Sequence, residues 1–424
     1  MTRFTSTARC WATCLLIAAI LAQTSAAVHA QKVLVSHTPF TSPATVFLYD
    51  LARQQVERHF PADAFISART TADGRFAVAL RGESTRVYDL ANGSWFDLPL
   101  GFDPRAAHPR EIALFGLVDG PVSLVMTTGT AARLDATGLT RFGGCAAGTV
   151  TSLSLSGDGR VLVTTCASGD VAILDAATGA VLRMLPLGSG RSVAPDFGGQ
   201  RLLVANAVAG SPVQLVDAVT GATLAEATVP SAEPCIPHVV SASPAGTIAI
   251  VACQATLGPF VPPTTNYVLR LPGLTWGPVV GVDEFVASIS PDETRIFSTF
   301  RHRLNLWGWV YVRDLATGTP SLTAPLLASI AVAYPPLAPV LSATVTGARV
   351  DLQWTLPAAS PPAAGYRLDV GSGPGLADIT AFTLGAQSAL VVPAAPAGRY
   401  YVRLVANNAA GASLPSNELV VDVP

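Results

Sequence analysis

The stretch Val150–Gly188 reads VTSLSLSGDGRVLVTTCASGDVAILDAATGAVLRMLPLG and contains four short runs in which apolar residues alternate with polar or small ones. Such alternation puts one set of side chains on a buried face, which predicts half-buried β-strands. The runs are separated by Gly157-Asp158-Gly159, by a short polar segment at 167–170 and by 176–179. Gly-Asp-Gly is a tight hairpin signal. The stretch therefore predicts one antiparallel sheet of four strands and about forty residues.

The same unit recurs along most of the chain. An aspartate ends the third run of most units, and successive units begin about forty residues apart. A degenerate copy is RLPGLTWG at Arg270–Gly277. This period with four strands per unit is typical of a β-propeller, and seven units between about 31 and 334 predict seven blades. The aspartates are Asp50, Asp89, Asp135, Asp175, Asp217 and Asp314.

The repeat resembles the WD-repeat (WD40-like) and YVTN-type propeller families. In three units an aspartate is followed by Thr-Gly, which matches the end of the third strand of a YVTN-type repeat. The Trp-Asp dipeptide of a true WD repeat is absent, because Tyr, Leu, Val or Arg precedes the aspartate. The resemblance covers about 300 residues and implies a propeller fold without a particular function.

The first unit lacks a first strand of its own, because Val33–Ser36 already has the pattern of a second strand. The run SIAVAY at Ser329–Tyr334 is free to supply it. A ring closed by strands from both ends of the chain has no exposed sheet edge. We therefore predict that the propeller spans 31–334 and closes in this way.

A proline-rich linker at 335–339 ends the repeats. From 340 to 424 the chain resembles a fibronectin type III domain, in which Trp354 has the position of the core tryptophan and Tyr400 is the candidate tyrosine corner. The predicted fold is therefore all-β: a seven-bladed β-propeller followed by a C-terminal fibronectin type III (immunoglobulin-like) β-sandwich.

The first thirty residues resemble a signal peptide. Arg3 and Arg9 precede the short apolar core Cys14–Ala22, and Val28-His29-Ala30 is a small-x-small cleavage site. The mature protein is then expected to begin at Gln31 and to be secreted, periplasmic or at the cell surface. An uncleaved membrane anchor is the alternative. No segment of the mature chain reaches about eighteen uninterrupted apolar residues, so we expect no membrane span there.

Four cysteines remain after signal removal, in an oxidising setting. The repeat predicts the disulfides Cys145–Cys166 and Cys235–Cys253, each flanking the hairpin between a first and a second strand and facing across the antiparallel pair. Each would be worth about 3 kcal/mol in the chain-entropy model. A zinc site is the rival interpretation, but Cys-x-x-Cys spacing and a nearby histidine pair are both absent. We expect no metal.

The charge balance argues against a nucleic-acid partner. The net charge is −2 and only 13% of the 424 residues are charged, whereas nucleic-acid-binding domains carry basic patches. Lys32 is the only lysine, and Ala, Gly and Pro are abundant, which indicates a GC-rich bacterial genome.

Three long loops are expected on one face of the ring, in the first, sixth and seventh blades, at His37–Thr45, Gln254–Asn266 and Phe300–Trp309. These blades are consecutive in a closed ring, so the loops should form one continuous rim, and exposed loops are where binding residues concentrate. The last loop gathers cations and aromatics, which are favoured at recognition hot spots. Alternatively, the tryptophans begin a third strand and pack between blades while the arginines are solvated. The candidate ligand-binding residues are Arg301, His302, Arg303, Trp307 and Trp309.

The expected first strands offer mostly Ser and Ala to the central channel, with Asp196 and His238 as polar exceptions. Either of these can equally be a satisfied structural residue. The histidines lack metal-ligand spacing, and no catalytic or cofactor motif is present. The expected function is an exported, non-enzymatic binding protein for an extracellular or envelope protein or a carbohydrate. The alternative is a propeller hydrolase or lyase that uses Asp196 and His238 at the channel mouth.

Overall fold

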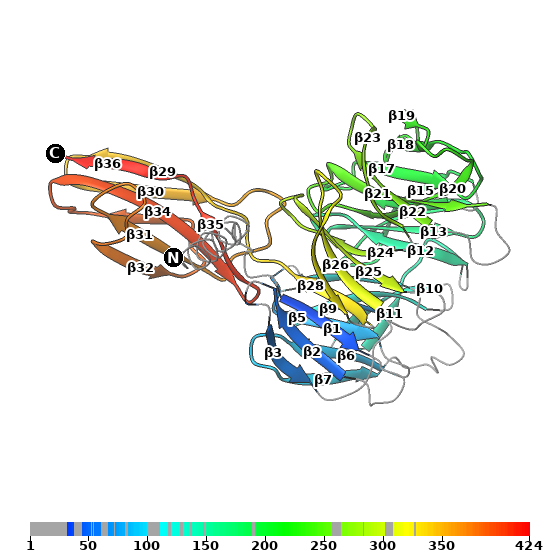
Figure 1. Ribbon diagram of the computed structural model, residues 1–424, viewed down its shortest axis with the longest axis horizontal. Coiled ribbons are helices and arrows are strands. Elements are labelled where there is room, and N and C mark those ends of the chain that lie inside the picture. The colour runs from blue at the N-terminus through cyan, green and yellow to red at the C-terminus, as the bar shows by residue number, and fades with distance from the viewer. Residues whose placement is uncertain are drawn as a thin grey trace, which may run out of the picture.

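The computed structural model is built from strands and turns, with no helix among the residues it describes (Figure 1). It describes Lys32 to Pro424 except for 38–44, 52, 54, 61–66, 72, 81–83, 100–110, 118–119, 128–129, 136–137, 147–148, 189–190, 257–263, 283, 302–307 and 326–327.

The part before the linker forms antiparallel sheets of four strands each, which we label A to G and describe from the first strand outward. Sheet A contains β28 (Ala328–Ala333), β1 (Lys32–His37), β2 (Thr45–Asp50) and β3 (Gln55–Phe60). Sheet B contains β4 (Ser67–Thr70), β5 (Phe76–Leu80), β6 (Ser84–Asp89) and β7 (Trp95–Pro99). Sheet C contains β8 (Glu111–Leu117), β9 (Gly120–Thr127), β10 (Thr130–Asp135) and β11 (Gly138–Arg141). Sheet D contains β12 (Val150–Leu155), β13 (Val161–Cys166), β14 (Asp170–Asp175) and β15 (Val181–Pro186).

The remaining three sheets follow the same order. Sheet E contains β16 (Arg191–Pro195), β17 (Arg201–Asn206), β18 (Val213–Asp217) and β19 (Thr223–Ala227). Sheet F contains β20 (Cys235–Ala242), β21 (Ile248–Ala255), β22 (Thr264–Arg270) and β23 (Thr275–Val282). Sheet G contains β24 (Glu284–Ile289), β25 (Arg295–Arg301), β26 (Gly308–Asp314) and β27 (Pro320–Pro325).

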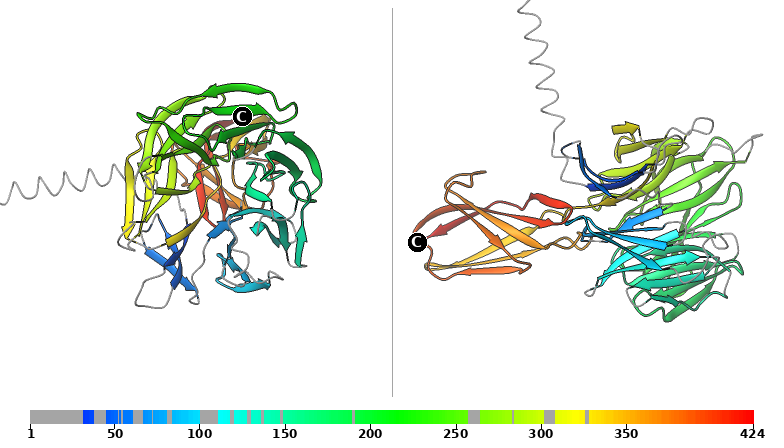
Figure 2. Two further views of the ribbon diagram at one scale, coloured as in Figure 1. Left: turned by 90° about the vertical axis from the view of Figure 1, so that its right-hand side faces the viewer. Right: turned by 90° about the horizontal axis from the view of Figure 1, so that it is seen from below.

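The first strands of these sheets contact one another in a closed cycle. Strand β28 contacts β4, and the contacts continue through β8, β12, β16, β20 and β24 back to β28. Figure 2 (left) shows the sheets arranged around this ring. The fold is therefore propeller-like, with the first strand of each sheet on the inside.

The ring is closed by strands from both ends of this region, as predicted. Strand β28 pairs antiparallel with β1, and Ala331 lies opposite Leu34. Where another sheet would have a hairpin between its first two strands, the chain leaves β28 for the linker. We call this end of the ring, where the inner strands end, the lower end.

The aspartates of the repeat end the third strand in every sheet except F, as predicted, at the last residue of β2, β6, β10, β14, β18 and β26. The degenerate copy places Arg270 at this position in β22. Asp175 shows why the residue recurs, because its Oδ1 accepts hydrogen bonds from the Thr178 backbone N–H (2.8 Å) and the Thr178 hydroxyl (2.7 Å). These bonds, led by the hydroxyl, lower the pKa of Asp175. The aspartate therefore fixes a turn.

Small side chains lie on the inner strands of sheets A and B. Ala68 on β4 and Ala331 on β28 are buried in one cluster with larger residues of the outer strands, such as Phe60 and Tyr88. The Phe60 and Tyr88 rings meet edge to face, with centroids 4.8 Å apart. Larger apolar residues are buried on other inner strands, for example Leu153 on β12 and Ile289 on β24, so small residues are a feature of this cluster and not of every inner strand.

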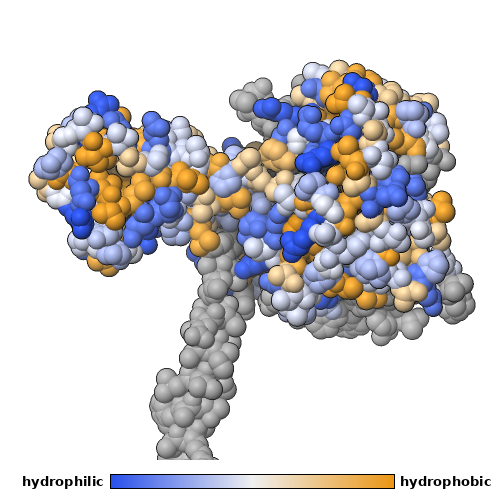
Figure 3. All heavy atoms as spheres, turned by 90° about the horizontal axis from the view of Figure 1, so that it is seen from above, coloured by the Kyte–Doolittle hydropathy of each residue, from blue (hydrophilic) through white to orange (hydrophobic). Residues whose placement is uncertain are grey.

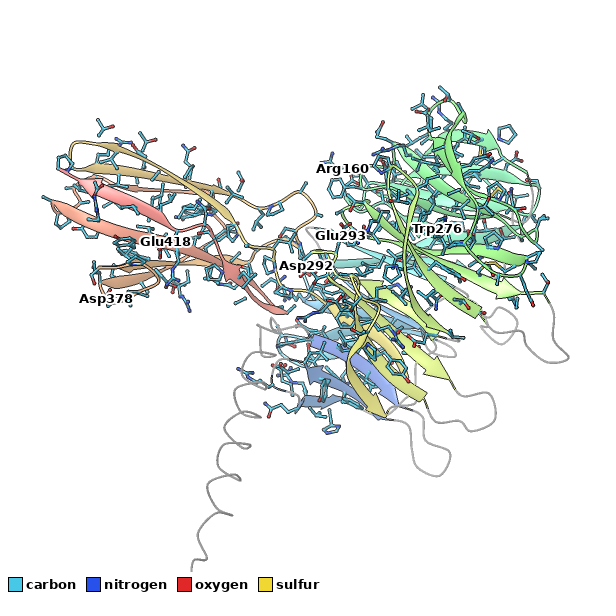
Figure 4. The ribbon with its side chains drawn as sticks, turned by 45° about the horizontal axis from the view of Figure 1, so that its top comes forward. Arg160, Trp276, Asp292, Glu293, Asp378 and Glu418 are labelled. Atoms are coloured by element: carbon cyan, nitrogen blue, oxygen red, sulfur yellow. A yellow bond between two sulfur atoms is a disulfide. The ribbon has the colours of Figure 1, made fainter. Side chains whose placement is uncertain are left out.

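The lower hairpins are linked between sheets. Glu293, at the tip of the β24–β25 hairpin, has a φ of +55°, where the β20–β21 hairpin has Gly246. Its carboxylate accepts hydrogen bonds from the hydroxyls of Ser243 and Thr247 in sheet F. Its neighbour Asp292 accepts one from Ser290 in its own hairpin. Both acidic residues lie on the side of the ring that faces the C-terminal domain (Figure 4).

The C-terminal domain is a sandwich of two sheets. One contains β29 (Val340–Thr346), β30 (Arg349–Thr355) and β33 (Ala389–Val392). The other contains β32 (Thr380–Leu384), β31 (Gly365–Gly371), β34 (Gly398–Asn408) and β35 (Gly411–Pro415), and β36 (Leu419–Val423) also pairs with β34.

The core of the sandwich contains the residues expected from the sequence. Trp354 is buried, and its ring meets that of Tyr366 edge to face at 5.5 Å. The Tyr400 hydroxyl donates to the Pro396 carbonyl (2.9 Å), which is the hydrogen bond of a tyrosine corner. Figure 3 shows an apolar patch on one face of this domain. The domain as a whole has several exposed apolar residues, among them Val345, Val391 and Val420.

The sandwich is held against the lower end of the ring by the turn between β34 and β35 (Figure 1). Ala410 is fully buried in a cluster that includes Ala333 at the end of β28. The Asn408 side chain donates to the Tyr334 carbonyl (3.0 Å). A Cβ on Gly74, in the β4–β5 hairpin, would lie 2.8 Å from the Ala410 Cβ. The closure strand, the linker and the sandwich are thus packed together.

Both predicted cysteine pairs lie at disulfide distance, with Cα–Cα separations of 5.4 Å for Cys145–Cys166 and 5.5 Å for Cys235–Cys253. The expected facing positions are wrong. Cys145 precedes β12, where Val150 is the residue opposite Cys166. Cys253 lies opposite Pro237 instead of Cys235. Each pair therefore joins residues offset along the strands, because the loop that enters β12 and the register of β20 add residues that the repeat pattern does not show.

Candidate functional site

The sheets that bear the three long loops are neighbours in the ring, because β20 contacts β24 and β24 contacts β28. In sheets A, F and G the expected long loop joins the second strand to the third, and the described strand ends that flank it lie at the end of the ring opposite the lower end, which we call the upper end.

The tip of the predicted rim lies outside the described residues, and this includes His302, Arg303 and Trp307. Arg301 is the last residue of β25 and pairs with Gly308. Trp309 is the second residue of β26 and lies opposite Phe300, so its backbone belongs to the third strand. The side chains of Arg301 and Trp309 also lie outside the described part.

A buried ion pair lies in the same sheet as this loop. The Glu284 side chain, at the start of β24, is 3% exposed and pairs with Arg313 of β26. Arg313 Nε donates to Glu284 Oε2 (2.9 Å), and a second bond runs from Arg313 Nη2 to Oε1. The Ser298 hydroxyl of β25 also donates to Oε2. The carboxylate is thus held by donors from two strands.

The same residue connects sheet G to sheet F, because the Asn266 side chain of β22 donates to the Glu284 backbone carbonyl (2.9 Å). Ser298 is three residues before Arg301 in β25. The network therefore fixes the strand on which the predicted rim loop begins. With both carboxylate oxygens engaged, Glu284 is suited to positioning that strand. The sequence analysis does not single out Glu284; its isolation in the apolar run EFVASI is the signal that could have found it.

Asp196 is engaged at the lower end of the ring. Its Oδ1 accepts a hydrogen bond from the Gln200 backbone N–H (2.8 Å), and its Oδ2 accepts one from Arg201 Nε (3.0 Å). The carboxylate thereby closes the hairpin between β16 and β17. Asp196 therefore has the geometry of a structural residue, which was one of the two roles that the sequence allowed for it.

His238 lies in the upper half of β20. Ala252 and Asn266, at the same level of sheet F, are buried, whereas His238 is exposed. Strand β20 is the innermost strand of sheet F, so His238 lies on the inner part of the ring. Surrounding protein still desolvates it, and this desolvation lowers the pKa of His238. Asp196 follows the end of its strand, roughly 15 Å further along the axis, so these two residues are not brought together.

The lowered pKa of His238 predicts a stability change below neutral pH. As the pH falls below about 6.5, the unfolded chain takes up a proton that the folded protein does not, so the free energy of unfolding decreases until the folded pKa is reached. We expect His238→Gln to remove part of this decrease, measured by urea unfolding at pH 7.5 and 5.5, whereas His59→Gln, at an exposed position on β3, keeps it. Equal pH dependence in the two variants would contradict this.

Within the described part of the chain, no group of three or more His, Cys, Asp or Glu side chains is arranged to hold a metal ion. No helix formed by the described residues could span a lipid bilayer.

No protein family model matches this chain, and no curated protein matches its sequence. Among solved structures, it is similar to a chain in the mitotic checkpoint complex, with a TM-score of 0.46 and 15% identity over 61% of this chain and 78% of that chain. For dihydro-heme d1 dehydrogenase NirN in complex with DHE, the TM-score is 0.45 and the identity 15%, over 71% of this chain and 74% of that chain. For Kuenenia stuttgartiensis hydrazine synthase, the TM-score is 0.33 and the identity 16%, over 64% of this chain and 65% of that chain. Likeness at this level carries no information about activity.

Proposed function

We propose that this chain is an exported, non-enzymatic binding protein, a seven-bladed β-propeller joined to a fibronectin type III-like module. The four-stranded sheets A to G would be the blades, and 1–30 a signal peptide that is removed near Ala30. The two cysteine pairs fit an extracellular or periplasmic location, where disulfides persist. The ligand would be an extracellular or envelope protein or a carbohydrate.

One observation carries the proposal: the second-to-third-strand loops of six or more residues all belong to consecutive sheets of a closed ring, E, F, G and A, and the three loops of the predicted rim are those of F, G and A. A rigid scaffold that presents neighbouring loops on one side is the usual arrangement of a binding surface. The Glu284–Arg313 network supports the strand that leads to the central loop. Arg301, His302, Arg303, Trp307 and Trp309 would supply cationic and aromatic contacts to the ligand.

The test compares the chain from Gln31 to Pro424 with Arg301→Ala/Trp307→Ala/Trp309→Ala on glycan and envelope-protein arrays. We expect the triple variant to bind its ligand at least about tenfold more weakly, since hot-spot residues each contribute more than about 1 kcal/mol. Arg160→Ala, an exposed cation at the lower end, is the matched control and should keep full affinity. Unchanged affinity in the triple variant, at an unchanged melting temperature, would rule out the rim.

A further inference from the structure

A second surface lies on the outside of the ring, where sheets A and B meet. Strand β7 is the outermost strand of sheet B, and two consecutive aromatic side chains on it are exposed, Trp95 by 39% and Phe96 by 44%. Consecutive residues of a strand point to opposite faces, so Trp95 and Phe96 serve different surfaces. Single exposed aromatics are ordinary, but Trp95 has neighbours that give it a fixed orientation.

Arg86 and Asp97 hold the indole of Trp95. The guanidinium of Arg86 lies 3.6 Å from the ring centroid of Trp95, which is cation–π stacking. Arg86 is 4% exposed, and it donates from Nε to Asp97 Oδ1 (2.7 Å) and from Nη2 to Asp97 Oδ2 (2.8 Å). Such a two-point bond fixes the guanidinium plane. The exposed part of the indole is therefore presented in one orientation before any ligand arrives, which reduces the entropy lost on binding.

A positive charge from the neighbouring sheet lies against the turn that leads into β7. Arg58 of β3 is half-buried, and its guanidinium lies against Gly93, two residues before Trp95: a Cβ on Gly93 would be 2.4 Å from Arg58 Nη1. Arg58 Nη1 is buried and has no hydrogen-bond partner, and no acidic residue of the described part forms an ion pair with Arg58. An unpaired guanidinium beside a partly desolvated surface favours an anionic ligand.

We propose that Trp95, Arg86, Asp97 and Arg58 form a binding site for an acidic polysaccharide that contains uronic acid residues. The C–H face of a pyranose ring would stack on the exposed indole of Trp95. Arg58, after a small side-chain shift, would pair with the sugar carboxylate, and Asp97 would accept hydrogen bonds from hydroxyl groups. This inference rests on the proposed binding role. It names acidic polysaccharides as a ligand class, and it places their site on the outside of the ring instead of at the predicted rim.

The experiment titrates the chain from Gln31 to Pro424 with polygalacturonate, and with dextran as the neutral comparison. We expect saturable binding to polygalacturonate, weakened roughly tenfold by Trp95→Ala and less by Trp95→Phe, which keeps a ring over Arg86. Arg58→Gln should weaken binding to polygalacturonate and remove its salt dependence. The matched control is Phe96→Ala, at a similarly exposed aromatic on the opposite face, which should bind normally.

Three results would overturn the site: no saturable binding to polygalacturonate, equal losses in Trp95→Ala and Phe96→Ala, or unchanged affinity in Trp95→Ala. A melting temperature measured for each variant separates lost binding from lost folding. The rim variant Arg301→Ala/Trp307→Ala/Trp309→Ala is titrated in parallel and should bind polygalacturonate normally. If this variant alone loses affinity, the rim binds the polysaccharide and the Trp95 site is wrong, while the proposed binding function stands.

Discussion

Replacing Arg313 with methionine is expected to lower the free energy of unfolding by about 3–5 kcal/mol, the usual loss when one partner of a buried ion pair is removed. The reason is the uncompensated Glu284 carboxylate, which is 3% exposed and, among the residues that the structure describes, would keep only the Ser298 hydroxyl as a side-chain donor. The measurement is urea unfolding followed by both fluorescence and far-UV circular dichroism, so that two-state behaviour is checked.

Two further variants test whether the loss of stability comes from the unpaired Glu284 charge. Glu284→Gln/Arg313→Met removes both charges and should recover much of the stability that Arg313→Met loses. Arg349→Met breaks an ion pair with Asp351 on the surface of the sandwich, where the arginine side chain is 55% exposed, and should change stability little. If Arg313→Met is no more destabilising than Arg349→Met, the ion pair does not support sheet G.

Gly74→Ala is expected to loosen the sandwich from the ring. The residue has a φ of +67°, which disfavours any side chain by about 1–2 kcal/mol. In addition, the new Cβ would lie 2.8 Å from the Ala410 Cβ, so the β34–β35 turn must move away. Overpacking of this kind adds about 1–3 kcal/mol. We expect a larger radius of gyration in solution scattering and faster proteolysis of the linker at 335–339.

Gly347 provides the matched control for this joint. Its φ is +60°, and a Cβ there would have nothing within 4 Å, so Gly347→Ala introduces backbone strain without a steric clash. The double variant Gly74→Ala/Ala410→Gly removes the 2.8 Å contact, leaves the Ala410 backbone N at 3.3 Å and loses the buried Ala410 methyl, so it should recover part of the compact form while keeping the strain. Equal effects of Gly74→Ala and Gly347→Ala on scattering and proteolysis would show that Ala410 does not hold the domains together.

The features that could be predicted from the sequence depend on residues that are close together in the chain. The aspartate at each third-strand end could be located because its bonds reach only two or three residues ahead, as between Asp175 and Thr178. The closure strand followed from the alternation of SIAVAY and the missing first strand before Val33. The same holds for Tyr400, whose partner is Pro396.

Contacts that depend on strand register or on neighbouring sheets could not be predicted. Glu284 and Arg313 are 29 residues apart, and only the packing of sheet G brings their side chains together. Trp95 reaches Arg86 only through the pairing of β6 with β7. The offset of Cys145 from Val150 also follows from a loop whose length the repeat does not specify. The sequence correctly predicted that the sheets bearing the rim loops are neighbours in the ring. The rim side chains lie outside the described residues, so their arrangement stays a prediction.

We propose that the chain from Gln31 to Pro424 binds a macromolecule outside the cytoplasm. The measurement that tests it most directly is a titration of the chain from Gln31 to Pro424 against glycan and envelope-protein arrays, with metal analysis of the same sample. We predict saturable binding of a protein or carbohydrate by the metal-free protein. Stoichiometric metal without any macromolecular ligand would contradict the claim and direct attention to chemistry near His238 on the inner part of the ring.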